Sequence, residues 1–323
     1  MYSCRICGNS KRNMFYEAKE MLLGLGDAFK YAECNECGCL WLVDVPEDFT
    51  KYYPSNYYSF VSFEGSTSLL RQRLLAGFIW LNAIYYNNKF KLITVPTFAL
   101  WPNSFLPVRP TTGIFDKKIL DVGCGNGKML YRLSLAGFRK LFGCDPYIEK
   151  DIQYSLPNGN ICIRKCEIFK LDETYDIIML NHSLEHMQDQ EKVLRKLHSL
   201  LAEYGELIIR IPIVSGNAWT KYRETWFALD APRHIFLHSL RSLSLLASKT
   251  GFQVLRVIHD STEGTIRSKL YMKGLTLSQQ NEFLKRSFNG GMLHWMHKVY
   301  SVYLNWVAKS DHIRVYLTKK DVN

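Results

Sequence analysis

The sequence lacks any uncharged apolar run of the ~18 residues that would suggest a membrane span. Its first residues, Met1 to Cys4, lack the charged and then apolar pattern of a secretory signal peptide. It also has no internal repeats and no low-complexity segments, which disfavours solenoid and disordered classes of protein. Nine cysteines without a secretory signal indicate a reducing compartment. We therefore expect a cytoplasmic protein, with attachment to the face of the inner membrane as the alternative.

What the chain does have is enough apolar material for a large core. It contains 323 residues, of which 47% are hydrophobic, and this length predicts one large domain plus an appendage. The net charge of +11 is unevenly distributed. Acidic residues outnumber basic ones in residues 1–67, whereas the basic excess lies in residues 68–118 and 241–323.

A glycine-rich stretch from Asp121 to Gly127 follows the short apolar run 118–122 and leads directly into a helical pattern. This order is typical of the strand, tight turn and helix that open a doubly wound α/β unit. Glycines let the backbone approach a ligand closely, and free N–H groups at the helix start can receive a polar or anionic group. A second predicted strand ends about twenty residues later at Asp145, where an acid can accept hydrogen bonds from both ribose hydroxyls of an adenosine.

These two features together resemble class I S-adenosylmethionine-dependent methyltransferases. The fingerprint of NAD-binding proteins would need a glycine at position 128, where this chain has Lys128. The resemblance implies that Asp145 holds the ribose and that the turn 121–127 holds the methionine portion. Glu167 or Cys166 would lie near the adenine. The cofactor residues expected from it are Asp121, Gly123, Gly125, Asp145, Glu167, Asn181, His182, Tyr57 and Tyr58.

The predicted fold class is α/β, a Rossmann-like, doubly wound, seven-stranded methyltransferase sheet with a small N-terminal zinc-ribbon module and helical insertions. Strands are expected at 118–122, 140–145, 160–164, 175–181, 205–211, 252–259 and 312–317, with helices such as 190–203 between them. The expected domains are residues 1–50 (zinc-ribbon module), 51–114 (aromatic linker and helical segment) and 115–323 (methyltransferase domain, with a helical insertion at about 265–309).

Two Cys-x-x-Cys-Gly sequences lie in the N-terminal segment, at residues 4–8 and 34–38. Each can form a tight turn that presents two thiolates, and together they supply the four ligands of a tetrahedral zinc site. We expect Cys4, Cys7, Cys34 and Cys37 to bind a structural zinc ion, and Cys39 to be a bystander.

An aromatic linker follows the cysteines, and in the methyltransferases that this chain resembles such a segment folds over the cofactor. Tyr57 and Tyr58 are the candidates for that role. The alternative is that both rings pack the linker onto the core. A helix is expected at 68–92.

Two loops carry the candidate catalytic residues, since both border the carboxyl edge of the predicted sheet. The first contains Glu185 and His186, and the second, 226–234, contains His234. We expect His186 to be the general base, with His234 as second choice. Glu185 could instead be an exposed surface acid, and Arg233 could bind a phosphate or simply pair with Asp230. His182 and His186, four residues apart, could also bind a metal, but no third ligand is evident in the sequence.

The two loops and the paired cysteine turns together resemble the zinc-ribbon methyltransferases of bacterial surface-polysaccharide and deoxysugar biosynthesis. This resemblance implies methyl transfer to a sugar hydroxyl of a nucleotide- or lipid-linked glycan, with O-methylation favoured over sugar C-methylation because the chain is short. S-adenosylmethionine and a structural zinc are the expected cofactors.

Three other functions fit the sequence less well. An RNA methyltransferase with a zinc module would predict a basic zinc module and an Asn/Asp-Pro-Pro-aromatic motif, and neither is present, so no nucleic acid is expected as a partner. A quinone or lipid O-methyltransferase does not usually bring a zinc ribbon, and a non-catalytic binding protein is disfavoured by the intact glycine turn. The aromatic, basic segments 68–92 and 290–309 would contact a membrane surface or form a homodimer.

Overall fold

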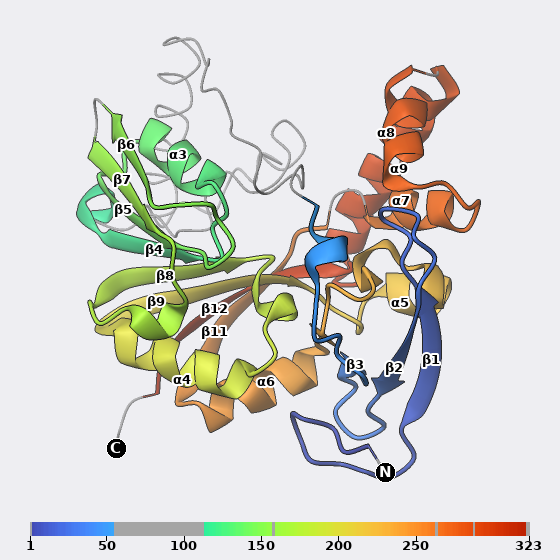
Figure 1. Ribbon diagram of the computed structural model, residues 1–323, viewed down its shortest axis with the longest axis horizontal. Helices are drawn as coiled ribbons and strands as arrows, with labels where there is room; N and C mark the ends of the chain where they lie inside the picture. Colours follow the sequence, from blue (N-terminus) through green and yellow to red (C-terminus); the bar gives the residue numbers. More distant parts are fainter. Residues whose placement is uncertain (1, 55–112, 157–158, 262–263, 287, 321–323) are drawn as a thin grey trace. The chain divides into compact units, whose positions relative to one another are not determined.

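The computed structural model describes residues 2–54, 113–156, 159–261, 264–286 and 288–320 (Figure 1). The chain forms two compact units. Unit 1 comprises Met1–Pro54, Leu184–Glu191 and Arg210–Val315, and unit 2 comprises Ser55–Ser183, Lys192–Ile209 and Tyr316–Asn323. The predicted helix at 68–92 and the two linker tyrosines, Tyr57 and Tyr58, lie outside the described residues.

The main sheet has eight strands in the order β11-β12-β9-β8-β4-β5-β7-β6. Strand β4 pairs in parallel with β5 and β8, and β5 pairs in parallel with β7. The predicted Rossmann-like α/β fold with a mostly parallel central sheet is therefore confirmed. The strands are β4 (Lys118–Val122), β5 (Lys140–Cys144), β6 (Ile152–Leu156), β7 (Gly159–Arg164), β8 (Tyr175–Asn181), β9 (Leu201–Pro212), β11 (Phe252–His259) and β12 (His312–Lys319).

The predicted count of seven strands is not confirmed, because the described residues add β6 at the edge of the sheet. This strand pairs antiparallel with β7, with Leu156 opposite Gly159. Its five residues alternate between partly buried and exposed, as expected for an edge strand. The predicted helix at 190–203 ends earlier, at Leu200, where β9 begins.

The first strand–turn–helix unit forms where the sequence predicts it. Strand β4 buries most of its residues, and helix α3 (Lys128–Leu135) starts directly after the glycine turn and buries Leu130 and Leu133. Gly127 precedes the helix at a φ of 80°, and a Cβ at this position would lie 2.3 Å from Ile163 Cδ1. The positive φ favours glycine here, and any larger residue would also require the Ile163 side chain to move.

Unit 1 contains a second, four-stranded sheet in the order β1-β2-β3-β10. Its strands are β1 (Met14–Lys19), β2 (Ala28–Glu33), β3 (Leu40–Leu42) and β10 (Phe236–Leu237). Strand β10 pairs antiparallel with β3, placing Phe236 opposite Trp41, and both rings are buried. The N-terminal cysteine segment is thereby tied to a part of the chain almost two hundred residues further on.

Helices complete both units. Ser239 caps α6, because its hydroxyl accepts a hydrogen bond from the N–H of Ser242 while the Ser242 hydroxyl accepts one from the N–H of Ser239. In the part of the chain that the structure describes, no helix is both long and apolar enough to cross a membrane. The remaining helices are α4 (Gln190–Leu200), α5 (Asn217–Tyr222), α6 (Leu240–Lys249), α7 (Gly264–Tyr271), α8 (Leu277–Arg286) and α9 (Phe288–Trp306).

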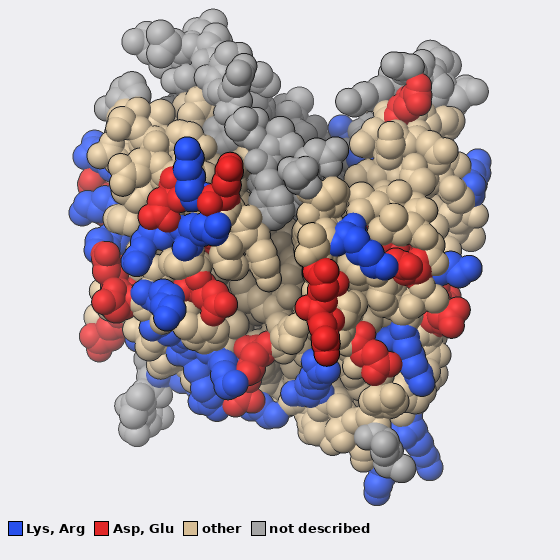
Figure 2. All heavy atoms as spheres, viewed as in Figure 1, with Lys and Arg blue, Asp and Glu red and all other residues tan. Residues whose placement is uncertain are grey.

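Charged side chains on the described surface are mixed in sign. In the view of Figure 2, Lys and Arg side chains alternate with Asp and Glu side chains over the described residues. Much of the basic excess of the sequence belongs to residues 68–118, most of which lie outside the described part of the chain.

Candidate cofactor turn, cysteine cluster and histidine cluster

The glycine turn of unit 2 has the geometry of a ligand-binding turn. Gly123, Gly125 and Gly127 all adopt positive φ angles. The N–H of Gly123 donates to the carbonyl oxygen of Cys144 (2.8 Å), and the N–H of Gly125 donates to Asp145 Oδ2 (2.8 Å). These two bonds fix the turn against the end of β5. Other residues are disfavoured at these positions, because a positive φ angle is costly for a residue that has a Cβ atom.

Two buried acids stand at the carboxyl ends of neighbouring parallel strands, Asp121 on β4 and Asp145 after β5. Asp145 also accepts a hydrogen bond from the N–H of Tyr147 (2.9 Å), and its oxygens retain further lone pairs. Burial raises the pKa of Asp121 to about 7, although a hydrogen bond from Asn181 (3.4 Å) opposes this shift. A cation bound at this edge would favour the ionised form of Asp121.

The other predicted cofactor residues lie at the ends of β8 and β7. Asn181 is the last residue of β8, and His182 follows it with a positive φ of 53°. Ser183, which the sequence did not single out, donates from its hydroxyl to the carbonyl of Val122 (2.7 Å) and so joins the ends of β8 and β4. Glu167 is exposed after β7, where it precedes the short helix η3 (Ile168–Lys170).

The four predicted zinc ligands come together in unit 1. One potential ligand atom of each cysteine lies within 4.8 Å of the others, with Cys4 Sγ 3.6 Å from Cys37 Sγ and Cys7 Sγ 3.4 Å from Cys34 Sγ. Gly8 and Gly38 take positive φ angles and close the two turns through N–H bonds to the carbonyls of Cys4 and Cys34. The sulfurs are too far apart for disulfide bonds, whose S–S length is about 2.05 Å.

The three predicted catalytic residues also come together in unit 1. Glu185 and His186 lie on the short helix η4 (Leu184–His186), and His234 follows η6 (Phe227–Leu229). One potential ligand atom of each lies within 4.8 Å of the other two, and the two imidazole rings are 4.7 Å apart between centroids. Glu185 is 1% exposed, so its alternative interpretation as an exposed surface acid is excluded.

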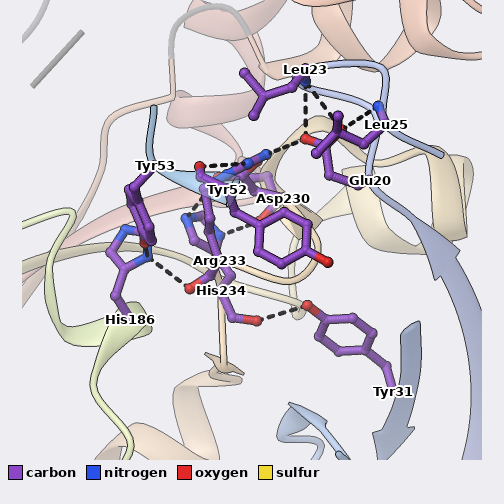
Figure 3. Close-up of polar contacts among 11 residues, drawn as sticks. Glu20, Leu23, Leu25, Tyr31, Tyr52, Tyr53, His186, Asp230, Arg233 and His234 are labelled. Atoms are coloured by element: carbon purple, nitrogen blue, oxygen red, sulfur yellow. Dashed lines mark hydrogen bonds and ion pairs between the residues drawn. The ribbon is translucent and has the colours of Figure 1, made fainter. Parts of the chain in front are cut away.

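Arg233 holds the loop that carries His234, as Figure 3 shows. Its guanidinium donates to Asp230 (2.7 Å), to Glu20 (2.8 Å) and to the carbonyl of Tyr52 (3.2 Å), and its side chain is fully buried. The sequence left open whether this arginine binds a phosphate or pairs with Asp230. The structure shows the pairing, and Glu20 joins it.

Hydrogen bonds fix the orientation of both imidazoles. His186 Nδ1 lies 2.8 Å from the carbonyl oxygen of Arg233, and His234 Nδ1 lies 2.7 Å from that of Ala228. A carbonyl oxygen can only accept, so Nδ1 donates in both rings and Nε2 carries the lone pair of each neutral imidazole. Burial, followed by the neighbouring His186, lowers the pKa of His234 to about 4, so this ring is neutral at physiological pH.

Two aromatic residues of this site were missed from the sequence. The Tyr53 hydroxyl lies 3.2 Å from His186 Nδ1, and the Tyr31 hydroxyl donates to the carbonyl oxygen of His234 (2.8 Å). Tyr53 belongs to the same aromatic run as the two predicted linker tyrosines, which was the available signal. Nothing in the local sequence around Tyr31 indicates its partner two hundred residues away.

Comparison with known proteins identifies the class. Residues 101–257 match the sequence profile of a methyltransferase domain. Curated relatives are named tRNA U34 carboxymethyltransferase. The one from Campylobacter hominis is 28% identical over 34% of this chain and 41% of its own length, and the one from Azotobacter vinelandii is 24% identical over 70% of this chain and 72% of its own.

For several of these curated relatives the alignment spans about half their length. Among solved structures, the cyclopropane synthase MmaA2 from Mycobacterium tuberculosis aligns with a TM-score of 0.40 at 14% identity, covering 64% of this chain and 78% of that one. A likeness at this TM-score carries no weight for the function.

Residues 101–257 carry a methyltransferase domain, so the methyltransferase predicted from the glycine turn and the strand-end acids is confirmed at the level of this domain. The resemblance to class I methyltransferases is confirmed with it, and S-adenosylmethionine is supported as cofactor.

Two other predictions are wrong. The curated relatives bear the name of tRNA-modifying enzymes, which contradicts both the sugar-hydroxyl acceptor in polysaccharide biosynthesis and the expectation that no nucleic acid is a partner. Loop motifs led to the glycan assignment, yet the structure shows that much of the second loop packs internally through Arg233. The acidic N-terminal segment was taken to exclude nucleic acid, although the basic excess lies elsewhere in the chain.

Proposed function

We propose that this chain transfers a methyl group from S-adenosylmethionine to tRNA. The observation that carries the proposal is the match with tRNA U34 carboxymethyltransferases, which extends over 70% of this chain for the Azotobacter vinelandii relative. The missing Asn/Asp-Pro-Pro-aromatic motif does not oppose it. That motif serves enzymes acting on exocyclic amines, and a uracil base has no such amine. The net charge of +11 favours a polyanionic acceptor.

In this proposal the cofactor binds at the carboxyl edge of β4, β5 and β8. The carboxylate of Asp145 would accept hydrogen bonds from the ribose hydroxyls, and the turn with Gly123 and Gly125 would lie against the methionine portion. Asp121 and Asn181 would complete the polar end of this subsite. Support comes from the positive φ angles of the glycines and from the two buried acids side by side. When bound, the cofactor supplies an activated one-carbon group on sulfur, and the residues position it.

Glu167, His182, Tyr57 and Tyr58 remain proposed cofactor contacts from the resemblance alone. The domain boundaries also remain proposals, with a zinc-ribbon module at 1–50, a linker at 51–114 and a methyltransferase domain at 115–323 that contains a helical insertion at about 265–309.

The four clustered cysteines would hold a structural zinc ion. A tetrahedral site with Zn–S bonds of about 2.3 Å separates its sulfurs by roughly 3.8 Å, close to the 3.6 and 3.4 Å found between the two cysteine pairs. The N–H of Cys37 lies 3.4 Å from Cys34 Sγ and Asn9 Nδ2 lies 3.7 Å from the same sulfur, and such N–H donors stabilise a thiolate. With four protein ligands there is no open position, so the zinc would stabilise the fold rather than take part in the reaction.

A transfer assay with cofactor carrying a labelled methyl group tests the proposed acceptor. The acceptors offered are total tRNA from cells that lack this gene, ribosomal RNA, duplex DNA and a glycan fraction. We expect label in tRNA that is removed by ribonuclease, and strongly reduced label when Asp145→Ala replaces the wild type at a cofactor concentration below saturation. Label in ribosomal RNA or DNA with unlabelled tRNA would contradict the proposal.

A further inference from the structure

We propose that Glu185, His186 and His234 bind a divalent first-row metal ion, as a site of two histidines and one carboxylate separate from the cysteine cluster. The three side chains each place one potential ligand atom within 4.8 Å of the others. A metal about 2.1 Å from each ligand would draw these atoms closer together. The sequence pointed to His182 and His186 as a metal-binding pair, and the structure instead supplies His234 and Glu185 as partners of His186.

The hydrogen bonds around the two imidazoles are those of metal ligands. Histidines that bind a metal usually donate their other ring N–H to a backbone carbonyl or a carboxylate, which fixes the ring and its tautomer. Both rings do so here, through the carbonyls of Arg233 and Ala228 at 2.8 and 2.7 Å. Each therefore presents Nε2, with its lone pair, as the available ligand atom. A single general base would need only one imidazole oriented in this way, whereas here both are.

The charge around the cluster also suits a cation. His234 Nε2 faces Asp230 Oδ2 at 3.8 Å, and Glu185 is 1% exposed beside the two rings. A neutral imidazole nitrogen that directs a lone pair toward a carboxylate is stabilised when a cation binds nearby. Asp230 itself is occupied by Arg233, whose Nε lies 3.1 Å from both carboxylate oxygens, so it would act as an outer partner and not as a ligand.

The backbone that presents the ligands is held in place before any metal arrives. The N–H of Ile235 donates to the carbonyl oxygen of Glu185 (2.8 Å), and the Tyr31 hydroxyl donates to that of His234 (2.8 Å). The His186–Arg233 bond is a second connection between the loop of Glu185 and His186 and the loop of Arg233 to Ile235. Ligands held in this way lose little conformational entropy on binding a metal.

The donor set indicates the kind of metal. Two imidazoles and one carboxylate suit Mn²⁺, Fe²⁺, Co²⁺ or Zn²⁺, and three protein ligands leave positions open for water or for an acceptor atom. A metal in such an open site lowers the pKa of a bound water or hydroxyl group. The three residues would then act as metal ligands, which replaces the prediction that His186 alone is the base.

Binding of Mn²⁺ tests this site directly and does not depend on the proposed acceptor. The full-length protein, loaded with one equivalent of zinc for the four thiolates, is titrated with Mn²⁺ while electron paramagnetic resonance measures the free ion, because thiolates prefer zinc and leave Mn²⁺ to nitrogen and oxygen ligands. We expect one bound Mn²⁺ per chain in the wild type. Glu185→Gln and His234→Asn should each weaken binding by about 100-fold or more, since loss of an outer partner alone costs 10–100-fold.

His259→Asn is the matched control, because His259 is a half-buried histidine bonded to Ser310 (2.9 Å) away from the cluster. It should bind Mn²⁺ like the wild type, and unchanged zinc content and circular dichroism should show that each variant is folded. Co²⁺ bound at this site should give visible ligand-field bands without the thiolate charge-transfer band of a cysteine site. Failure of the folded wild type to bind either ion, or equal binding by all variants, would overturn the proposal and return His186 to the role of base.

Discussion

The buried contact between Glu20 and Arg233 allows a sharp stability prediction. The two side chains are fully buried and meet at 2.8 Å. Glu20 also accepts hydrogen bonds from the N–H groups of Leu23 (2.9 Å) and Leu25 (3.0 Å). In Glu20→Gln the shape is kept, but the new amide NH₂ group must face either the guanidinium or a backbone N–H, and all of these are donors.

Asp230 still pairs with Arg233 in this variant, so the cost stays below the ~3–5 kcal/mol of leaving a buried charge without a partner. Losing one charge-assisted hydrogen bond and leaving one donor unsatisfied should together lower the free energy of unfolding by about 2–4 kcal/mol. Urea denaturation followed by circular dichroism measures this as a lower midpoint at an unchanged slope.

The matched control is Glu173→Gln, which removes a surface ion pair with Lys118 (2.9 Å) whose side chains are 54% and 39% exposed. It should cost less than ~1 kcal/mol. If Glu20→Gln were no more destabilising than Glu173→Gln, the account of Arg233 as the residue that fixes the His234 loop would be refuted.

Three further predictions concern zinc, cofactor and pH. Cys34→Ser should lose the zinc and aggregate, whereas Cys39→Ser should keep it, and elemental analysis distinguishes the two. Asp145→Ala should weaken S-adenosylmethionine binding in calorimetry by ~1.5–3 kcal/mol, because charge-assisted bonds to the ribose are lost, and wild-type affinity would disprove that role. Burial lowers the pKa of His238 to about 4, so the unfolded chain binds more protons than the folded chain between pH 6.5 and 4. The free energy of unfolding should therefore decrease as the pH is lowered through this window. His238→Gln should flatten this dependence in urea titrations at several pH values, and an unchanged dependence would show that other groups cause it.

The parts of the structure that follow from local pattern could be predicted. The strand 118–122, the helix after Gly127 and the paired cysteine turns each need only a few consecutive residues, and each formed where expected. The edge strand β6 does alternate apolar and polar residues, but the run is only five residues long and was not recognised as a strand. An edge strand needs one partner only, so its sequence is weakly constrained.

Contacts between distant segments were not predictable in the same way. Glu20 and Arg233 are 213 positions apart, and neither sits in a motif that indicates the other. Glu185, His186 and His234 were selected as polar residues of two predicted loops, but their sequence did not show that the two loops meet, as they do at the His186–Arg233 bond. The predicted acceptor was wrong for a different reason. The loop motifs were taken to contact the substrate, but Arg233 of the second loop instead packs inside the protein.

The central claim is that this chain modifies tRNA, and mass spectrometry of the product tests it most directly. Purified enzyme is incubated with S-adenosylmethionine and tRNA from cells lacking the gene, and the tRNA is then digested to nucleosides. The account predicts one nucleoside whose mass increases by one methyl group with wild-type enzyme, and much less of it with Asp145→Ala. An unmodified nucleoside profile from enzyme that binds its zinc and its cofactor would contradict it.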